Sequence, residues 1–366
     1  MQDLIKEINE KLNSLDFNKI WEGFKIYDYA LYNDKNVYLK DNVFPVDNRF
    51  LGNTSIKYNN KYIAIWKVTE SDKKNIDKLT ASLIHEMFHA HQFENNEKRF
   101  FNDLEGLKYP YNLENYKLRY HERMYLVDAI KEKVLDRKEK LFSKYLETRL
   151  KREKIISGVI NYEKAIETVE GCAEYVSLMA LKQLSKNEYR NKINNICNSL
   201  CELDRKIFDT RTLSYYSGAL SCIVASELGI EIIDNIGDSD TYVFDKIQNR
   251  KFDTDTDFEL ELSNNINYEK FEQLFNLYIN DIKNSIHSVM TGKNIINKTG
   301  KFIICGYDPM NMIRYDNMVL HKRFVFIYDG NEKKYIQGPI ITVSKNGEYE
   351  RCQKLIIKKS KDKTIK

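Results

Sequence analysis

Proline is confined to the two ends of this chain. Of its 366 residues only four are proline, Pro45, Pro110, Pro309 and Pro339, so none lies within 111–308. Proline breaks a helix interior because it lacks a backbone N–H and its ring clashes with the preceding turn. The middle of the chain is therefore free to form long helices, whereas the ends, which contain the prolines, favour strands and turns.

Helical periodicity fills this middle region and begins somewhat before it. Apolar residues recur at spacings of three and four in several segments, and this spacing predicts helices. The segments are 72–95, 113–157, 162–185, 186–205 and 212–228. The first of them follows a capping signal at Ser71 and Asp72.

The two ends of the chain are rich in β-forming residues separated by turn signals. Residues 25–39 and 55–68 place Tyr, Ile, Val and Trp around Asn-rich turns, and we expect each segment to form a hairpin. Further runs alternate with Asp-Gly-Asn-Glu and Lys-Asn-Gly turns at 301–307, 323–328, 335–343 and 353–358. They indicate a small β-rich unit at the C-terminus. The lysine-rich end, 354–366, is expected to be a frayed, solvated tail.

Composition restricts the partners of this chain. Lys and Arg total 58 against 54 Asp and Glu, a formal charge of +4, so no strong field draws the molecule onto nucleic acid or a membrane. Neither a transmembrane run nor a signal peptide is recognisable. The six cysteines are scattered and are expected to be reduced. The sequence therefore predicts a cytoplasmic protein with a peptide, protein or small-molecule partner, and leaves its oligomeric state open.

The chemistry of the chain begins at residues 85–89, His-Glu-Met-Phe-His, which fit the metal-binding pattern HExxH. Residues four apart lie on one face of a helix, so both imidazoles can reach a single ion at about 2.0–2.1 Å. Glu86 stands beside them, where it can serve a water molecule at the ion. The pattern predicts His85 and His89 as zinc ligands and Glu86 as the general base.

A third ligand is expected within residues 170–175, Glu-Gly-Cys-Ala-Glu-Tyr. With the HExxH pattern, this segment resembles the gluzincins, metallopeptidases whose third ligand is a glutamate on a following helix, often within Glu-Gly-x-Ala-x-Tyr. The resemblance implies that Glu170 is the ligand and that Gly171 lets helices pack closely. It also implies that Glu174, one turn on, accepts a hydrogen bond from a ligating histidine. Glu167, one turn before Glu170, remains the reserve candidate for either role.

A further motif of the same resemblance occupies residues 214–219, Ser-Tyr-Tyr-Ser-Gly-Ala. In the aminopeptidase branch of the gluzincins, a Tyr-x-x-Gly at the start of a later helix supplies a phenol that stabilises the oxyanion. Tyr215, three residues before Gly218, matches this spacing, and Tyr216 remains the alternate. The Gly-x-Met-Glu-Asn segment with which that branch captures a free amine is not found. Aminopeptidase specificity is therefore not implied.

The resemblance implies an α+β fold with a mainly helical, zincin-like catalytic core. We expect 1–70 to form an N-terminal hairpin region with a small antiparallel sheet, 71–290 the helical region with the metal site, and 291–366 the β-rich unit with its basic tail. Zincin folds usually place a substrate-pairing edge strand just before the metal helix. Residues 62–66 are expected to be either this edge strand or a plain buried strand.

The remaining candidates near the motif and elsewhere are expected to be ordinary residues. His91 lies two positions past His89 and so faces away from the metal, whereas Gln92 is on the ligand face and can line the site. The histidines without a partner at ligand spacing are His121, His287 and His321.

These features predict a hydrolase with one zinc ion per chain that cleaves peptide bonds through an activated water molecule. Two alternatives stay open. The zinc could staple two helices of a catalytically inactive binding protein, although structural zinc sites favour four ligands with cysteine prominent. The same site could also hydrolyse a non-peptide amide or an ester, because the loops that form its pocket cannot be placed from the sequence.

Overall fold

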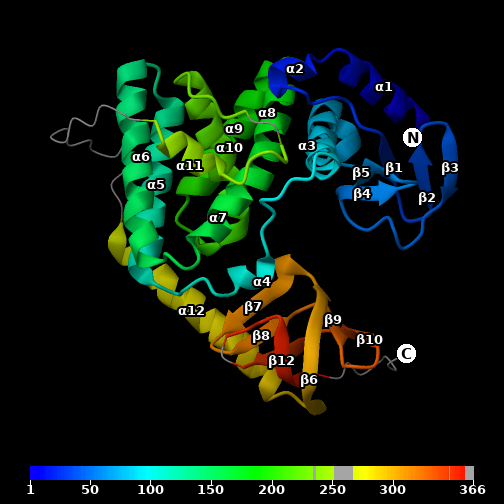
Figure 1. Ribbon diagram of the computed structural model, residues 1–366, viewed down its shortest axis with the longest axis vertical. Helices are drawn as coiled ribbons and strands as arrows, with labels where there is room; N and C mark the ends of the chain where they lie inside the picture. The colour runs from blue at the N-terminus through cyan, green and yellow to red at the C-terminus, as the bar shows by residue number, and fades with distance from the viewer. Residues whose placement is uncertain (234–235, 251–266, 346, 359–366) are drawn as a thin grey trace.

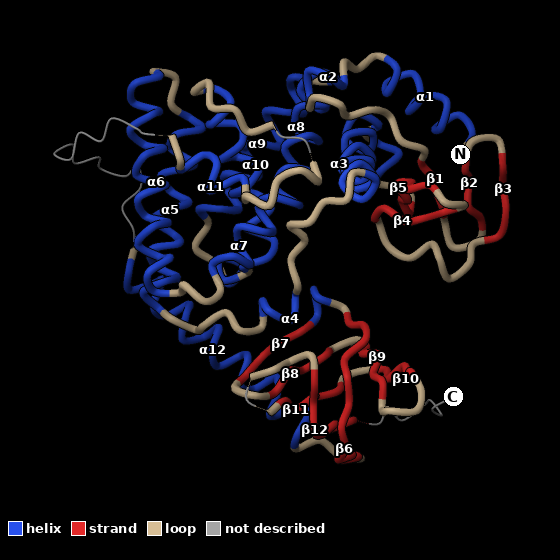
Figure 2. The backbone as a smooth tube through the Cα atoms, viewed as in Figure 1, coloured by secondary structure: helices blue, strands red, loops and turns tan. Residues whose placement is uncertain are grey.

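The computed structural model describes residues 1–233, 236–250, 267–345 and 347–358. It consists of a small N-terminal sheet, a helical body and an antiparallel C-terminal sheet, so the predicted α+β class is confirmed (Figure 1). The helices and strands segregate along the chain as the proline distribution suggests (Figure 2). Within the described residues, every helix is too short or too polar to span a lipid bilayer.

The N-terminal sheet has five strands in the order β3-β2-β1-β5-β4. Its elements are β1 (Tyr29–Tyr32), β2 (Asn36–Leu39), β3 (Asn42–Pro45), β4 (Thr54–Tyr58) and β5 (Lys61–Lys67), preceded by α1 (Gln2–Asn13) and α2 (Phe17–Ile20). Both predicted hairpins are present as β1–β2 and β4–β5. The prediction of an all-antiparallel sheet is wrong at one pair, because β1 and β5 run parallel and join the two hairpins.

This order settles the two alternatives for residues 62–66. They belong to β5, which is hydrogen-bonded on one side to β1 and on the other to β4. An internal strand has no unpaired backbone groups to offer, so β5 is the buried strand and not the edge strand. The edge next to it is β4.

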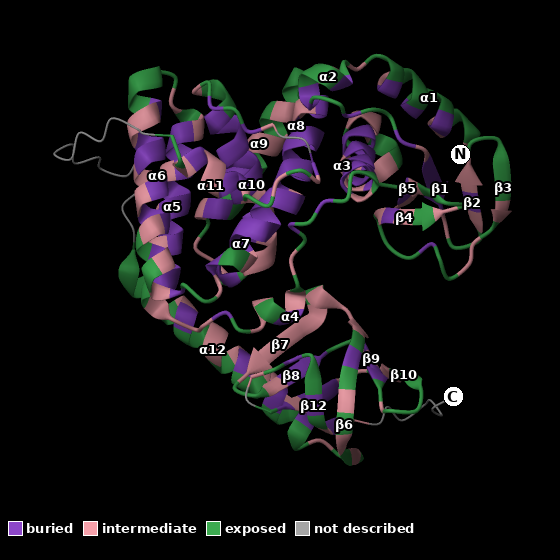
Figure 3. Ribbon diagram, viewed as in Figure 1, coloured by how far each residue is buried: buried purple, intermediate pink, exposed green. Residues whose placement is uncertain are grey.

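The metal-motif helix α3 (Ile76–Glu94) lies between this sheet and the helical body. It begins at Asn75, whose side-chain oxygen accepts a hydrogen bond from the backbone N–H of Lys78 at 3.1 Å. The predicted cap at Ser71 and Asp72 is therefore wrong by one turn, because these residues begin the short 3-10 turn η1 (Asp72–Lys74). Figure 3 shows α3, α8 and α10 largely buried.

The helical body contains most of the remaining helices. They are α4 (Asp103–Gly106), α5 (Leu113–Lys131), α6 (Leu135–Ile155), α7 (Ile160–Ile166), the π-helical turn η2 (Glu167–Gly171), α8 (Cys172–Leu184), α9 (Lys186–Cys201), η3 (Arg205–Phe208), α10 (Thr210–Glu227), α11 (Val243–Gln248) and α12 (Tyr268–Met290). The predicted helix 113–157 is two helices. Helix α5 ends at Lys131 because the next residue, Glu132, has an extended backbone. The Glu132 carboxylate accepts hydrogen bonds from the backbone N–H groups of Lys133 and Val134, so the helix ends there without proline or glycine.

The C-terminal unit is a seven-stranded antiparallel sheet in the order β10-β9-β6-β12-β11-β8-β7. Its elements are β6 (Ile295–Tyr307), η4 (Pro309–Asn311), β7 (Met312–Tyr315), β8 (Met318–His321), β9 (Phe324–Tyr328), β10 (Lys333–Gln337), β11 (Ile340–Ser344) and β12 (Arg351–Lys358). Residues 354–358 of the expected tail are part of β12, so that expectation is wrong for them, and 359–366 lie outside the described residues.

Helix α12 joins the helical body to this sheet. Its first half buries Phe271 and Phe275 in a cluster with the aromatic residues of the helical body. Its second half buries Ile286 and Val289 against the sheet. One helix therefore contributes to both cores, and the C-terminal unit is held against the body by packing as well as by the chain.

Two glycines allow α10 to cross closely over η2 and α8. A Cβ atom added at Gly218 would lie 2.7 Å from the carbonyl oxygen of Glu167 and 2.9 Å from Cα of Gly171. Backbone atoms cannot move aside as a flexible side chain can. The close packing expected of Gly171 thus depends equally on Gly218.

We predict that Gly218→Ala lowers the free energy of unfolding by about 1–3 kcal/mol, because the new methyl group meets backbone. Urea denaturation followed by circular dichroism measures this change. Gly158→Ala is the matched control, since a Cβ there meets no atom within 4 Å. Equal midpoints for the two variants would show that the crossing tolerates a side chain.

Candidate metal centre

The structure brings His85, His89 and Glu170 together from two elements that are distant in sequence. The histidines lie one turn apart on α3, and Glu170 lies in the π-helical turn η2. Their ligand atoms all lie within 4.8 Å of one another. The Nε2 atom of His89 is 3.1 Å from Nε2 of His85 and 3.1 Å from Oε2 of Glu170, and His85 Nε2 is 3.5 Å from the same oxygen.

These distances fit a tetrahedral metal ion. Bonds of about 2.0–2.1 Å to tetrahedrally arranged ligands place the ligand atoms roughly 3.3–3.4 Å from one another. The observed triangle, with sides of 3.1, 3.1 and 3.5 Å, is close to this value. Two imidazoles and one carboxylate are also the donor set of a site that keeps a fourth position open. The residues therefore fit zinc in both geometry and chemistry.

Each histidine is oriented by a second partner on its other ring nitrogen. His89 Nδ1 lies 2.7 Å from Oε1 of Gln92, whose amide orientation is set by its own donation to the Val169 carbonyl at 3.0 Å. The Gln92 oxygen can only accept, so Nδ1 of His89 carries the proton and Nε2 has a free lone pair. Gln92, expected only to line the site, thus also orients the His89 imidazole.

Glu174 lies where the resemblance implies. Its Oε2 is 3.4 Å from Nδ1 of His85, and its Oε1 is 3.1 Å from Nζ of Lys192. Burial alone would lower the pKa of His85, but hydrogen bonds to Glu170 and Glu174 outweigh burial and raise the pKa to about 10. The carboxylates therefore favour a positive charge at this imidazole, which a proton or a metal cation can supply.

A cavity of about 340 Å³ opens beside these atoms. It is lined by Asn53, Thr54, His85, Glu86, His89, Phe93, Phe100, Phe101, Val169, Glu170, Arg211 and Tyr215. Glu86 is buried, and burial raises the pKa of its carboxyl group. Burial and the charge of Glu170 raise the pKa of the Tyr215 phenol, so this phenol keeps its proton at neutral pH. Of the two candidate tyrosines, Tyr215 lines the cavity and Tyr216 packs against the hydrophobic core.

Glu167, the reserve candidate, is not brought to the histidines. Its two carboxylate oxygens accept from Arg149 at 2.6 and 2.9 Å, and Ser217 Oγ donates to Oε1 at 2.7 Å. The wider turn of the π-helix separates Glu167 from Glu170 around the helix axis, so that the two carboxylates point to different partners. Single π-turns of this kind are frequent at functional sites.

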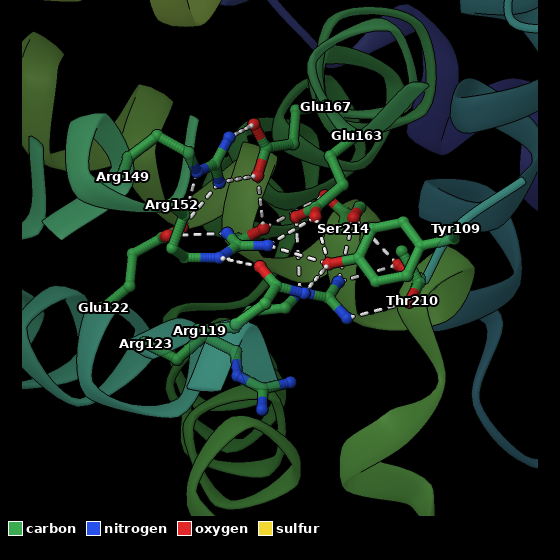
Figure 4. A network of polar contacts seen from close by, with 12 residues as sticks. Tyr109, Arg119, Glu122, Arg123, Arg149, Arg152, Glu163, Glu167, Thr210 and Ser214 are labelled. Atoms are coloured by element: carbon green, nitrogen blue, oxygen red, sulfur yellow. Dashed lines mark hydrogen bonds and ion pairs between the residues drawn. The ribbon is translucent and has the colours of Figure 1, made fainter. Parts of the chain in front are cut away.

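Glu167 is part of a buried network of charged side chains (Figure 4). Arg149 also contacts Glu122 at 2.6 Å, and Arg152 contacts Glu122 at 2.6 Å as well as Glu163. Burial alone would raise the pKa of Glu163, but Arg119 and Arg152 hold it far below its usual range. Each of these carboxylates is therefore ion-paired with at least one arginine inside the protein.

Arg211 is the main residue of the cavity that sequence reasoning missed. Its Nη1 pairs with Asp103, its Nη2 is 3.6 Å from Glu170 Oε1, and its guanidinium lies 4.6 Å from the ring centroid of Phe101. It also lies 5.6 Å from the ring centroid of Tyr215. The signal available in the sequence was its position four residues before Tyr215, one turn away on the same helix.

The other histidines lie away from the metal site, as expected. His91 Nδ1 is 3.2 Å from the Tyr27 hydroxyl, on the far side of α3. His121 contacts Tyr268 at 2.7 Å, and His321 contacts Thr342 at 3.1 Å. His287 is exposed on α12.

Comparison with known proteins gives no match: no family model, no curated protein and no solved structure matches this chain. The site is therefore interpreted from its own geometry.

We predict that Arg149→Met lowers the free energy of unfolding by about 3–5 kcal/mol, because it leaves the buried carboxylate of Glu167 without its cation and Glu122 with Arg152 alone. Chemical denaturation at pH 7 measures the change. Arg137→Met is the control, since Arg137 pairs with Glu132 but is 64% exposed, and such pairs contribute about 0–1 kcal/mol. Similar losses in both variants would contradict a special role for the network.

Proposed function

We propose that this chain is a zinc-dependent peptidase of gluzincin type, with one zinc ion per chain. One observation carries the proposal: Nε2 of His85, Nε2 of His89 and Oε2 of Glu170 converge with the spacing of three tetrahedral ligands. That convergence lies in a cavity that also contains a buried carboxylate, Glu86, and a protonated phenol, Tyr215.

His85, His89 and Glu170 would hold the ion. A bound zinc ion would act as a Lewis acid and lower the pKa of a water molecule toward about 7. Glu86 accepts a proton from the attacking water and returns it to the leaving nitrogen as the carbon–nitrogen bond breaks. The Tyr215 phenol donates a hydrogen bond to the carbonyl oxygen as negative charge develops there.

The edge strand β4 supports a peptide as the substrate. Thr54, the first residue of β4, and Asn53 just before it line the cavity beside the proposed metal ligands. A free strand edge offers backbone donors and acceptors to an extended chain, which can add to the sheet as a further strand. We therefore assign to β4 the substrate-pairing role that was one alternative for residues 62–66.

The lining also bears on the kind of peptidase. Among the cavity residues described, the carboxylates are Glu86 and Glu170, and both have a proposed role in catalysis or metal binding. No further acidic group lines the cavity to capture a free amine, which accords with an enzyme that does not require a substrate N-terminus. A cytoplasmic location is part of the proposal, and the scattered free cysteines support it.

The first test is elemental analysis of zinc in the purified protein and its variants. We expect one zinc ion per wild-type chain, and its loss in His89→Ala and Glu170→Ala. His287→Ala is the control, because this histidine is exposed on α12, away from the site. Zinc that stays bound without Glu170 would exclude the proposed ligand set.

The second test separates a peptidase from the alternatives. We expect Glu86→Gln to retain its zinc and to lose about 10²–10⁴-fold in turnover of peptide substrates, because the general base is gone. Equal turnover by the zinc-loaded variant would contradict the role of Glu86. A wild-type protein that binds zinc but cleaves only esters or non-peptide amides, or nothing, would favour one of the two alternatives.

A further inference from the structure

A second and larger cavity lies between the helical body and the C-terminal sheet. Its volume is about 860 Å³, and it is lined mainly by α4, η3, α10, α12, η4 and β7 and by the segment between α4 and α5. Binding sites for small molecules are typically about 300–1,000 Å³. The cavity is therefore large enough to hold a ligand of its own, and nothing in the proposed chemistry of the metal site uses it.

The two cavities meet at one side chain. Arg211 lines both the cavity at the metal site and the larger one, and its ion-pair partner Asp103 lines the larger one. The Nε atom of Arg211 is buried and has no hydrogen-bond partner. Buried donors without a partner are rare in proteins, and a bound ligand is one way to satisfy them. A ligand carbonyl group at this junction would do so.

The charges of the larger cavity do not suit an anionic ligand. Arg205 is paired with Asp281, and Arg211 is paired with Asp103. Arg314 donates to the carbonyl oxygens of Leu107 and Tyr109 at 2.9 and 2.7 Å. These three arginines are already committed and Lys322 is the one further cation among the described lining residues, so a phosphate or a nucleic-acid backbone would find little charge to bind.

Its uncharged lining suits a polypeptide. Tyr111 and Tyr278 present rings that are only partly buried, and Met310 and Met312 add flexible apolar surface from the C-terminal unit. Tyrosine and methionine bind varied side chains, since they combine large contact area with a polar group or adaptable shape. The hydroxyl oxygens of Ser285 and Ser288, whose protons are donated within α12, can accept hydrogen bonds from the N–H groups of a peptide backbone.

We propose that this cavity binds the part of a polypeptide substrate that lies beyond the cleaved bond, so that the substrate runs from β4 past the metal ligands and Arg211 to α12 and β7. The inference rests on the proposed peptidase function and extends it. It assigns the C-terminal sheet to substrate binding and makes a long, unfolded polypeptide the substrate class.

The test fills the cavity with a bulky side chain. Ser288 and Asn284 are exposed on α12 and line the cavity, so Ser288→Trp and Asn284→Trp block it without altering a core. Asn276→Trp is the control, because Asn276 is exposed on the same helix but does not line the cavity. The probe is fluorescein-labelled β-casein, an unfolded polypeptide, added to full-length zinc-loaded protein carrying Glu86→Gln so that it is not cleaved.

We expect each blocking substitution to raise the Kd for β-casein, measured by fluorescence anisotropy, by about tenfold or more, while Asn276→Trp leaves it unchanged. In proteins that retain Glu86, the ratio of kcat/KM for β-casein to that for hexapeptides should fall by a similar factor. An unchanged Kd and an unchanged ratio in both blocked variants would overturn the inference. Zinc-loaded wild type that binds β-casein but never cleaves it would instead overturn the peptidase function.

Discussion

A network of buried ion pairs inside the helical body fixes the elements that carry the candidate site. Three arginines oppose three glutamates there: Arg119, Arg149 and Arg152 against Glu122, Glu163 and Glu167. The network joins α5 and α6 to η2, and it reaches α10 through Ser217 and Ser214. Breaking a buried ion pair leaves an uncompensated charge, so these elements cannot shift separately without a large cost. Glu170 and Tyr215 are held on two of them.

The close crossing of η2 and α10 adds a steric constraint to this electrostatic one. Gly171 and Gly218 bring the two backbones together, with Glu167 ion-paired on one side of η2 and Glu170 facing the histidines on the other. The π-turn is what allows neighbouring glutamates to have such different partners. Packing and charge therefore act on the five residues of η2 (Glu167–Gly171), and the position of the Glu170 carboxylate is a result of both.

The sequence was most informative where chemistry depends on local spacing. Four residues chosen from their spacing lie at the same site: His85, His89, Glu174 and Tyr215. Their spacing was informative because residues three or four apart lie on the same face of a helix. What could not be predicted depends on contacts between distant segments. The parallel pairing of β1 with β5 makes β5 internal, and the role of Arg211 depends on Asp103, more than a hundred residues earlier. The ion pairing of Glu167 likewise required knowing where α6 lies.

The charge at the site is consistent with a divalent ion. Formal charges in and around the cavity belong to four carboxylates and two cations: Asp103, Glu86, Glu170 and Glu174 against Lys192 and Arg211. With both imidazoles neutral, four negative and two positive charges leave a formal excess of two negative charges in a largely buried region, which protons on the histidines or a divalent ion can balance. Buried carboxylates without compensation are costly, so they are normally paired or bound to metal. A zinc ion carries the two positive charges that would balance this excess, and the histidine nitrogens that would bind it lie within ion-pairing distance of two of these carboxylates.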